Sequence, residues 1–141
     1  MLVAEDSQVN SFLAKRLLET RGHRAVVVAN GREALAALKK DNYDLVLMDI
    51  QMPDMDGIEA TAAIRERERG SAFRQPVIAL TASAMKGDRE RCLAGGMDGY
   101  LSKPIRPQEL DELLETQLAR RREISKVSFA NEDTLSSPKK I

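Results

Sequence analysis

The fold follows from one stretch of sequence, the apolar run LVLM at residues 45–48 with Asp49 directly after it. A short apolar run without polar alternation predicts a strand that is buried on both faces, as strands of parallel sheets are. Similar runs, several of them rich in valine and isoleucine, lie at residues 2–4, 25–28, 77–80 and 99–101. The sequence therefore predicts five buried strands.

Apolar residues at helical spacing lie between and after these strands. They form three stripes: Val9, Phe12, Leu13 and Leu17; Ala34, Leu35 and Leu38; and Leu110, Leu113, Leu114 and Leu118. Asn30 with Glu33 predicts a cap at the start of the second helix, and Gly22 predicts the end of the first. Alternating strands and helices predict an open, doubly wound α/β sheet with helices on both faces.

Composition narrows the class of protein. The 141 residues include 22 basic and 22 acidic side chains, and a net charge of zero gives no support to direct binding of nucleic acid. The apolar runs are far shorter than the ~18 residues of a membrane-spanning helix, and the first residues lack the pattern of a signal peptide. We therefore expect a cytoplasmic protein that makes no contact with a membrane.

Two charged or polar segments lead to further predictions. The run RERER at residues 65–69 predicts a solvated helix face with ion pairs between residues four apart. From residue 126 the apolar periodicity stops, and residues 126–141 mix Ser, Asn, Asp, Pro and Lys without a stripe. We expect residues 126–141 to be a flexible tail or linker.

Chemically active side chains follow the predicted strands. Glu5 and Asp6 follow the first strand, Asp49 the third, Thr81 ends the fourth, and Lys103 follows the fifth. Ligands of open α/β sheets bind at the carboxyl ends of the strands, so we expect these groups to converge there. Two carboxylates about 5 Å apart repel by roughly 3 kcal/mol at an effective dielectric constant near 20, so three of them need a cation. Few oxygen ligands, partly open to solvent, favour Mg²⁺.

Three sequence blocks carry a family resemblance. They are LVLMDIQMPDMDG at residues 45–57, ALTA at 79–82 and YLSKP at 100–104. Together with the acidic pair they resemble the receiver domain of two-component response regulators. The resemblance implies a flavodoxin-like (βα)5 fold with strand order 2-1-3-4-5, for which a chemotaxis receiver is a known example, and a receiver domain over residues 1–125. The sequences of residues 6–10, 82–85 and 95–104 are most similar to those of receivers in hybrid histidine kinases. This resemblance implies that the chain belongs to the cytoplasmic part of a membrane-anchored kinase.

The resemblance also implies a role for each acidic residue. Asp49 is similar to the phosphoacceptor, which takes a phosphoryl group from phosphohistidine in a phosphorelay. Asp6 is similar to the direct ligand of Mg²⁺ and Glu5 to the ligand that acts through water. Asp49 is also similar to a ligand of Mg²⁺, and the backbone carbonyl of Gln51 completes the protein ligands.

Lys103 and Thr81 are similar to the groups that bind the phosphate oxygens, and the bond between Lys103 and Pro104 to a cis peptide of the family. Thr81 and Tyr100 resemble a switch pair, whose movement changes the surface that a partner reads. The implied partners are a histidine kinase or a histidine phosphotransfer domain that docks near the first helix. Val9, Phe12 and Leu13 cannot all face the core, so one of them is available for such a contact.

Two other functions stay open at this point. The first is a receiver-like scaffold that binds a partner without turnover, and the second is a phosphatase that acts on outside substrates. We expect no activity toward external substrates for this chain, whereas a hybrid parent would be a histidine kinase.

Overall fold

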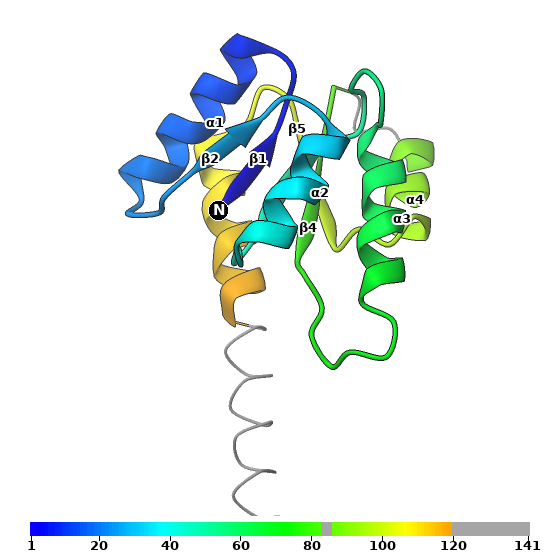
Figure 1. Ribbon diagram of the computed structural model, residues 1–141. Coiled ribbons are helices and arrows are strands. Elements are labelled where there is room, and N and C mark those ends of the chain that lie inside the picture. Colours follow the sequence, from blue (N-terminus) through cyan, green and yellow to red (C-terminus); the bar gives the residue numbers. More distant parts are fainter. Residues whose placement is uncertain (83–85, 120–141) are drawn as a thin grey trace, which may run out of the picture. The chain divides into compact units, whose positions relative to one another are not determined.

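The computed structural model describes residues 1–82 and 86–119, and its centre is one parallel sheet of five strands (Figure 1). The strands are β1 (Leu2–Ala4), β2 (Val26–Val28), β3 (Val46–Asp49), β4 (Val77–Thr81) and β5 (Gly99–Ser102). Their order in the sheet is β2-β1-β3-β4-β5, which confirms the predicted flavodoxin-like topology.

Helices follow the strands along the described chain. They are α1 (Gln8–Thr20), α2 (Gly31–Lys40), α3 (Gly57–Arg67), α4 (Lys86–Ala94) and a helix over residues 107–119. The chain divides into two units, Met1–Pro107 with the sheet and α1 to α4, and Gln108–Ile141, whose described part is the last helix. None of these helices has the length and apolarity needed to cross a bilayer. The predicted tail over residues 126–141 lies outside the described residues.

Burial of the strands depends on their place in the sheet. All residues of β1, β3 and β4 are buried, as the apolar runs predict. The prediction of burial on both faces is wrong for residues 25–28, because Val26 and Val27 of β2 are 44% and 38% exposed. β2 is an edge strand that pairs only with β1, so fewer neighbours cover it.

The two faces of the sheet carry different helices. One apolar cluster joins Leu2, Met48 and Ala79 of the sheet to Ala34, Ala60, Ile64 and Cys92 of α2, α3 and α4. The buried side chains of α1 are Ala14 and Leu18, and neither belongs to that cluster. This arrangement is the doubly wound architecture that the sequence predicts.

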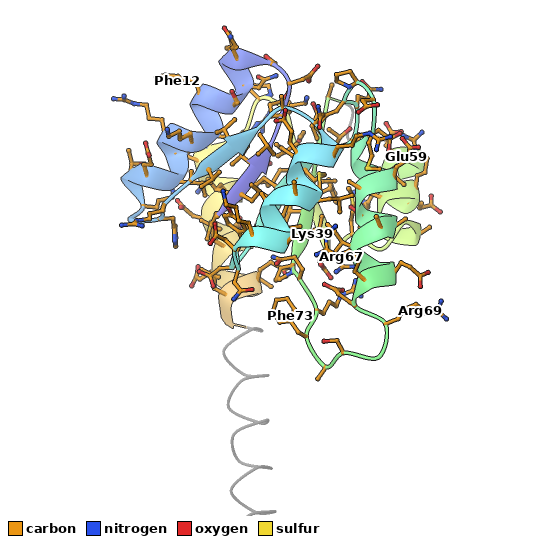
Figure 2. The ribbon with its side chains drawn as sticks, in the orientation of Figure 1. Phe12, Lys39, Glu59, Arg67, Arg69 and Phe73 are labelled. Carbon is orange, nitrogen blue, oxygen red and sulfur yellow. The ribbon has the colours of Figure 1, made fainter. Side chains whose placement is uncertain are left out.

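The predicted apolar stripe of α1 is wrong in its first members. Val9 is 77% exposed and Phe12 is 64% exposed, whereas Ala14 and Leu18 are fully buried. At 3.6 residues per turn, Val9 and Phe12 lie on the side of the helix opposite to Ala14 and Leu18. Figure 2 shows Phe12 on the outer side of α1. The first helix therefore presents an apolar pair to solvent.

Both predicted helix ends are confirmed. The Asn30 side chain accepts a hydrogen bond from the backbone N–H of Glu33 at 2.9 Å, which caps α2. After α1, Gly22 has a φ of 83°, and its N–H donates to the carbonyl of Glu19 at 3.0 Å. This left-handed residue, which glycine adopts without strain, ends the helix.

The start of α3 lies directly against the end of β3. Asp56 and Glu59 form a reciprocal capping box at the first turn of α3. A β-carbon placed on Gly57 would lie 2.2 Å from the backbone oxygen of Asp49. Only glycine permits this close approach, so Gly57 allows the start of α3 to pack against the end of β3 at Asp49.

The prediction of a solvated face over residues 65–69 is wrong for Arg65. Its guanidinium donates to the carbonyls of Gly96 and Gln75 at 2.9 and 2.8 Å, and to Glu68 and Asp98 at 2.9 Å. Its side chain is only 16% exposed. The loops before β4 and β5 supply most of these acceptors, and no local sequence pattern indicates such contacts. By contrast, Arg69 and Glu66 form an exposed pair three residues apart.

We predict that Gly57→Ala lowers the free energy of unfolding by about 2 kcal/mol or more, because the backbone of α3 or of Asp49 has to move. Urea unfolding measures the change. Gly87→Ala is the matched control, since nothing lies within 4 Å of a β-carbon at that position in α4. The control should be neutral or slightly stabilising. Equal unfolding midpoints for the two variants would contradict the close approach at Gly57.

We also predict that Arg65→Ala lowers the free energy of unfolding by about 2–3 kcal/mol, because it leaves partly buried acceptors without their donor. The exposed Arg69→Ala should change it by less than about 0.5 kcal/mol. Thermal or urea unfolding of both variants tests the difference. A similarly small change in the free energy of unfolding of both variants would show that the contacts of Arg65 do not stabilise the fold.

Candidate functional site

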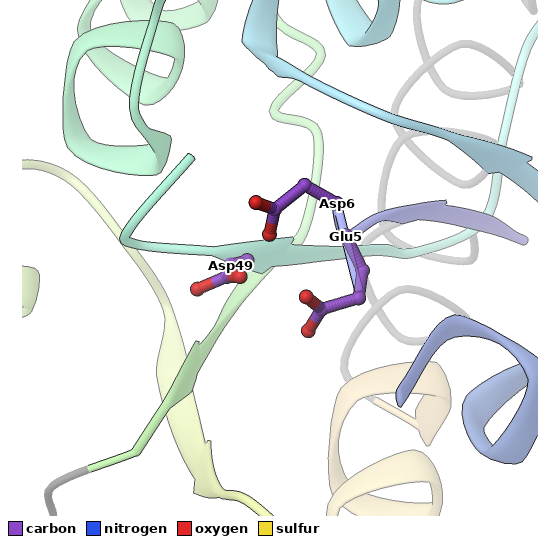
Figure 3. A group of neighbouring side chains, drawn as sticks. All are labelled: Glu5, Asp6 and Asp49. Atoms are coloured by element: carbon purple, nitrogen blue, oxygen red, sulfur yellow. The ribbon is translucent and has the colours of Figure 1, made fainter. Parts of the chain in front are cut away.

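Three carboxylates meet at the carboxyl ends of β1 and β3, which are neighbours in the sheet. Glu5 and Asp6 follow β1, and Asp49 is the last residue of β3 (Figure 3). One carboxylate oxygen of each residue lies within 4.8 Å of the others. Glu5 and Asp49 are buried, with 3% and 2% exposure, whereas Asp6 is exposed. The cluster therefore has a buried inner part and one open side.

The Asp49 carboxylate has a partner on each of its two oxygens. The backbone N–H of Gln51 donates to Oδ1 at 3.0 Å, and the Lys103 ammonium lies 3.0 Å from Oδ2. Lys103 follows β5, so its side chain reaches past the end of β4 to contact β3. These two contacts fix the orientation of the carboxylate.

Lys103 also bridges the two buried carboxylates. Its ammonium lies 3.2 Å from Oε1 of Glu5, and its side chain is 16% exposed. The backbone N–H of Lys103 donates to the carbonyl of Thr81 at 2.8 Å, which ties the end of β4 to the lysine. The peptide bond from Lys103 to Pro104 is cis, as the resemblance implies.

The charges of the site are not balanced. Burial raises the pKa of Glu5 to about 7, and the nearby Asp49 adds to this rise against the opposing effects of the Ser7 N–H and Lys103. Burial by itself lowers the pKa of Lys103, but Asp49 and Glu5 outweigh that effect and leave it above its usual value. Three carboxylates thus face one ammonium, and the site favours a further cation.

The donor set fits Mg²⁺. All of its side-chain donors are carboxylate oxygens, which are hard ligands, and the exposed Asp6 leaves the cluster open to water. Mg²⁺ prefers one or two carboxylates together with water and phosphate oxygens, whereas a protein Ca²⁺ site supplies more oxygens. Glu5, Asp6 and Asp49 are the side chains that could hold the ion.

The other residues predicted for the site, Thr81, Gln51 and Tyr100, differ in burial and in position. Thr81 is the buried last residue of β4, and Gln51 is exposed two residues beyond β3. Tyr100 lies inside β5, where it pairs with Ala79 of β4 and packs against the apolar cluster. The structure thus brings Glu5, Asp6, Asp49 and Lys103 into one group, while Tyr100 lies outside it.

Sequence reasoning missed three contacts. The backbone N–H of Ser7 donates to Glu5 Oε2 at 3.1 Å, and the Gln51 N–H donates to Asp49. Backbone donors leave no trace in residue identity, so no sequence signal could have found them. The third contact is that of Arg89, whose guanidinium lies over the Tyr100 ring.

Comparison with known proteins is consistent with this geometry. The family model "Response regulator receiver domain" matches residues 1–115. Hybrid signal transduction histidine kinase I of Dictyostelium discoideum is 46% identical over 125 residues, which are 85% of this chain and 7% of that kinase. The chain is therefore similar to one small part of this relative.

Two solved structures are also similar. The receiver domain of a sensor histidine kinase from Pseudomonas aeruginosa PAO1, with a magnesium ion coordinated in its active site cleft, is 42% identical with a TM-score of 0.75, covering 84% of this chain and 95% of that one. The receiver domain of Ssk1 from Saccharomyces cerevisiae, in complex with the histidine phosphotransfer protein Ypd1, is 31% identical with a TM-score of 0.72, covering 78% and 81%. With the strand order and the family match over most of its length, the chain belongs to the response regulator receiver domain family.

Proposed function

We propose that the chain serves a phosphorelay by accepting a phosphoryl group from a phosphohistidine onto Asp49 in the presence of Mg²⁺. The observation that carries the proposal is the buried Asp49 carboxylate, held between the Lys103 ammonium and the Gln51 N–H beside two further acids. A buried carboxylate with this many partners has a fixed direction of attack. We assign residues 1–125 to this receiver domain.

The reaction is an in-line transfer. A carboxylate oxygen of Asp49 attacks the phosphorus, an O–P bond forms, and the P–N bond to the histidine breaks with its electron pair returning to the imidazole. The product is an acyl phosphate. The chain supplies no separate base, because a carboxylate needs no deprotonation to attack.

The surrounding groups stabilise the charge that arrives. Lys103 exchanges its contact with Asp49 for a phosphoryl oxygen, and the hydroxyl of Thr81 donates to another. When bound, Mg²⁺ supplies positive charge against the attacking and transferred oxygens. Asp6, Asp49 and the Gln51 carbonyl would hold the ion directly, and Glu5 would act through water.

The acyl phosphate adds a charge of roughly −1.5 to −2 next to Thr81. Movement of the Thr81 hydroxyl toward the phosphoryl group vacates space on its face of the sheet, and the Tyr100 ring fills that space. This exchange shifts the equilibrium between two conformations of Thr81 and Tyr100. A partner binds the surfaces of the two conformations with different affinity.

The proposed partners are a histidine kinase or a histidine phosphotransfer protein. Val9 and Phe12 support this assignment, because they form an exposed apolar pair near the start of α1, which follows Asp6 closely. A partner covering this pair would bring its phosphohistidine near Asp49. We further propose that the chain is one domain of a hybrid histidine kinase, of the kind that it resembles in sequence.

We predict that the chain, incubated with acetyl phosphate and Mg²⁺, gains one phosphoryl group, and that Asp49→Asn or a metal chelator abolishes the gain. Intact-protein mass spectrometry measures it. Asp41→Asn, an exposed acid at the end of α2, is the matched control and should label normally.

The outcomes separate the candidate functions. Labelling that persists in Asp49→Asn contradicts the assignment of the phosphoacceptor. No labelling of the unmodified chain under any condition favours a scaffold without turnover. Steady hydrolysis of an aryl phosphate, in place of one self-limited cycle, favours a phosphatase.

We predict that Phe12→Ala slows phosphoryl transfer from phosphorylated Ypd1 by about tenfold, because a central aromatic contact is lost from the docking surface. Labelling by acetyl phosphate, which needs no docking, should be unchanged. Phe73→Ala is the control, since Phe73 is 46% exposed on the loop after α3, far from Phe12 (Figure 2). Equal slowing by both substitutions would contradict docking at α1.

A further inference from the structure

Arg89 of α4 lies over the ring of Tyr100 in β5. Its guanidinium carbon is 4.9 Å from the ring centroid, within the range of a cation–π contact. Arg89 is exposed and Tyr100 is half-buried, so the ring contacts both the apolar cluster and an arginine at the surface. The contact joins two elements that pack together in the same unit.

Tyr100 and Thr81 lie on the same face of the sheet. Tyr100 pairs with Ala79 in the register of β4 and β5, and Thr81 is two residues beyond Ala79. Because side chains alternate between faces along a strand, residues 79 and 81 point to the same side, and so does the partner of residue 79. A change at Thr81 is therefore next to the ring that Arg89 covers.

The contact is specific to one arginine of α4. Among the described residues, Arg89 has no carboxylate within salt-bridge distance, so its ring contact is not a by-product of an ion pair. Arg91, two residues later on the same helix, is also exposed but contacts no ring in the described part of the chain. α4 thus carries two arginines, and among the described residues only Arg89 contacts the Tyr100 ring.

We propose that Arg89 is a positioning residue that holds Tyr100 in the ring position of this structure and so opposes the movement that accompanies phosphorylation. The inference rests on the proposed function, because it concerns the regulation of that site. Arg89 touches neither Asp49 nor the carboxylate cluster, and it acts only through Tyr100. A ligand that favours the moved ring must first break the cation–π contact.

The experiment uses Tyr43→Phe as background, because the chain has two tyrosines and no tryptophan, so that Tyr100 becomes the only tyrosine. Arg89→Ala, Arg89→Lys and the matched control Arg91→Ala are compared in this background. The first readout is the NMR signal of the Tyr100 ring without and with beryllofluoride, a phosphoryl analogue, in Mg²⁺. The second is the affinity for beryllofluoride.

We expect the ring signal of unliganded Arg89→Ala to move toward its position in the beryllofluoride complex, and the affinity to rise about two- to fivefold. Arg89→Lys should lie between Arg89→Ala and the unmodified residue, and Arg91→Ala should match the background. An unchanged ring signal, unchanged affinity, or the same change in Arg91→Ala would overturn the proposal. Failure of the background protein to bind beryllofluoride would instead contradict the proposed function, while the ring signals of the unliganded chains still report on the contact.

Discussion

Two buried carboxylates, Glu5 and Asp49, share the single ammonium of Lys103, and this interaction requires the strand order of the sheet. β1 and β3 are neighbours and carry the acids, while the lysine comes from beyond β5 and contacts them past β4. Buried charges without a partner are costly, so the three groups stabilise one another only when all three strands are in place. The site therefore depends on long-range order that no single element supplies.

The charged groups at the two ends of the sheet differ in how completely they are paired. At the carboxyl ends, three carboxylates with one lysine leave the charge incompletely compensated, which favours a further cation. At the amino ends of β4 and β5, Arg65 and Asp98 are fully paired with each other and with backbone groups. The contacts of Arg65 join α3 to the loops before β4 and β5. At the other end of α3, Gly57 packs against the backbone of Asp49.

Residue identity and order were enough to predict the sheet, the strand order implied by the resemblance, both helix ends and the side chains at the strand ends. These features depend on local patterns and on the alternation of strands and helices. The exposure of β2 and the contacts of Arg65 could not be predicted, because they depend on which elements become neighbours. The orientation of α1 was mispredicted for a related reason: the buried stripe uses Ala14, and the larger Val9 and Phe12 face solvent. The backbone donors to Glu5 and Asp49 carry no sequence signal at all.

The most direct test of the account locates the phosphoryl group chemically. Borohydride reduces an aspartyl phosphate to homoserine, and peptide mass spectrometry after phosphorylation identifies the reduced position. We predict homoserine at residue 49 and nowhere else. Reduction at Asp6 in place of Asp49, or a borohydride-resistant phosphate on Thr81, would contradict it.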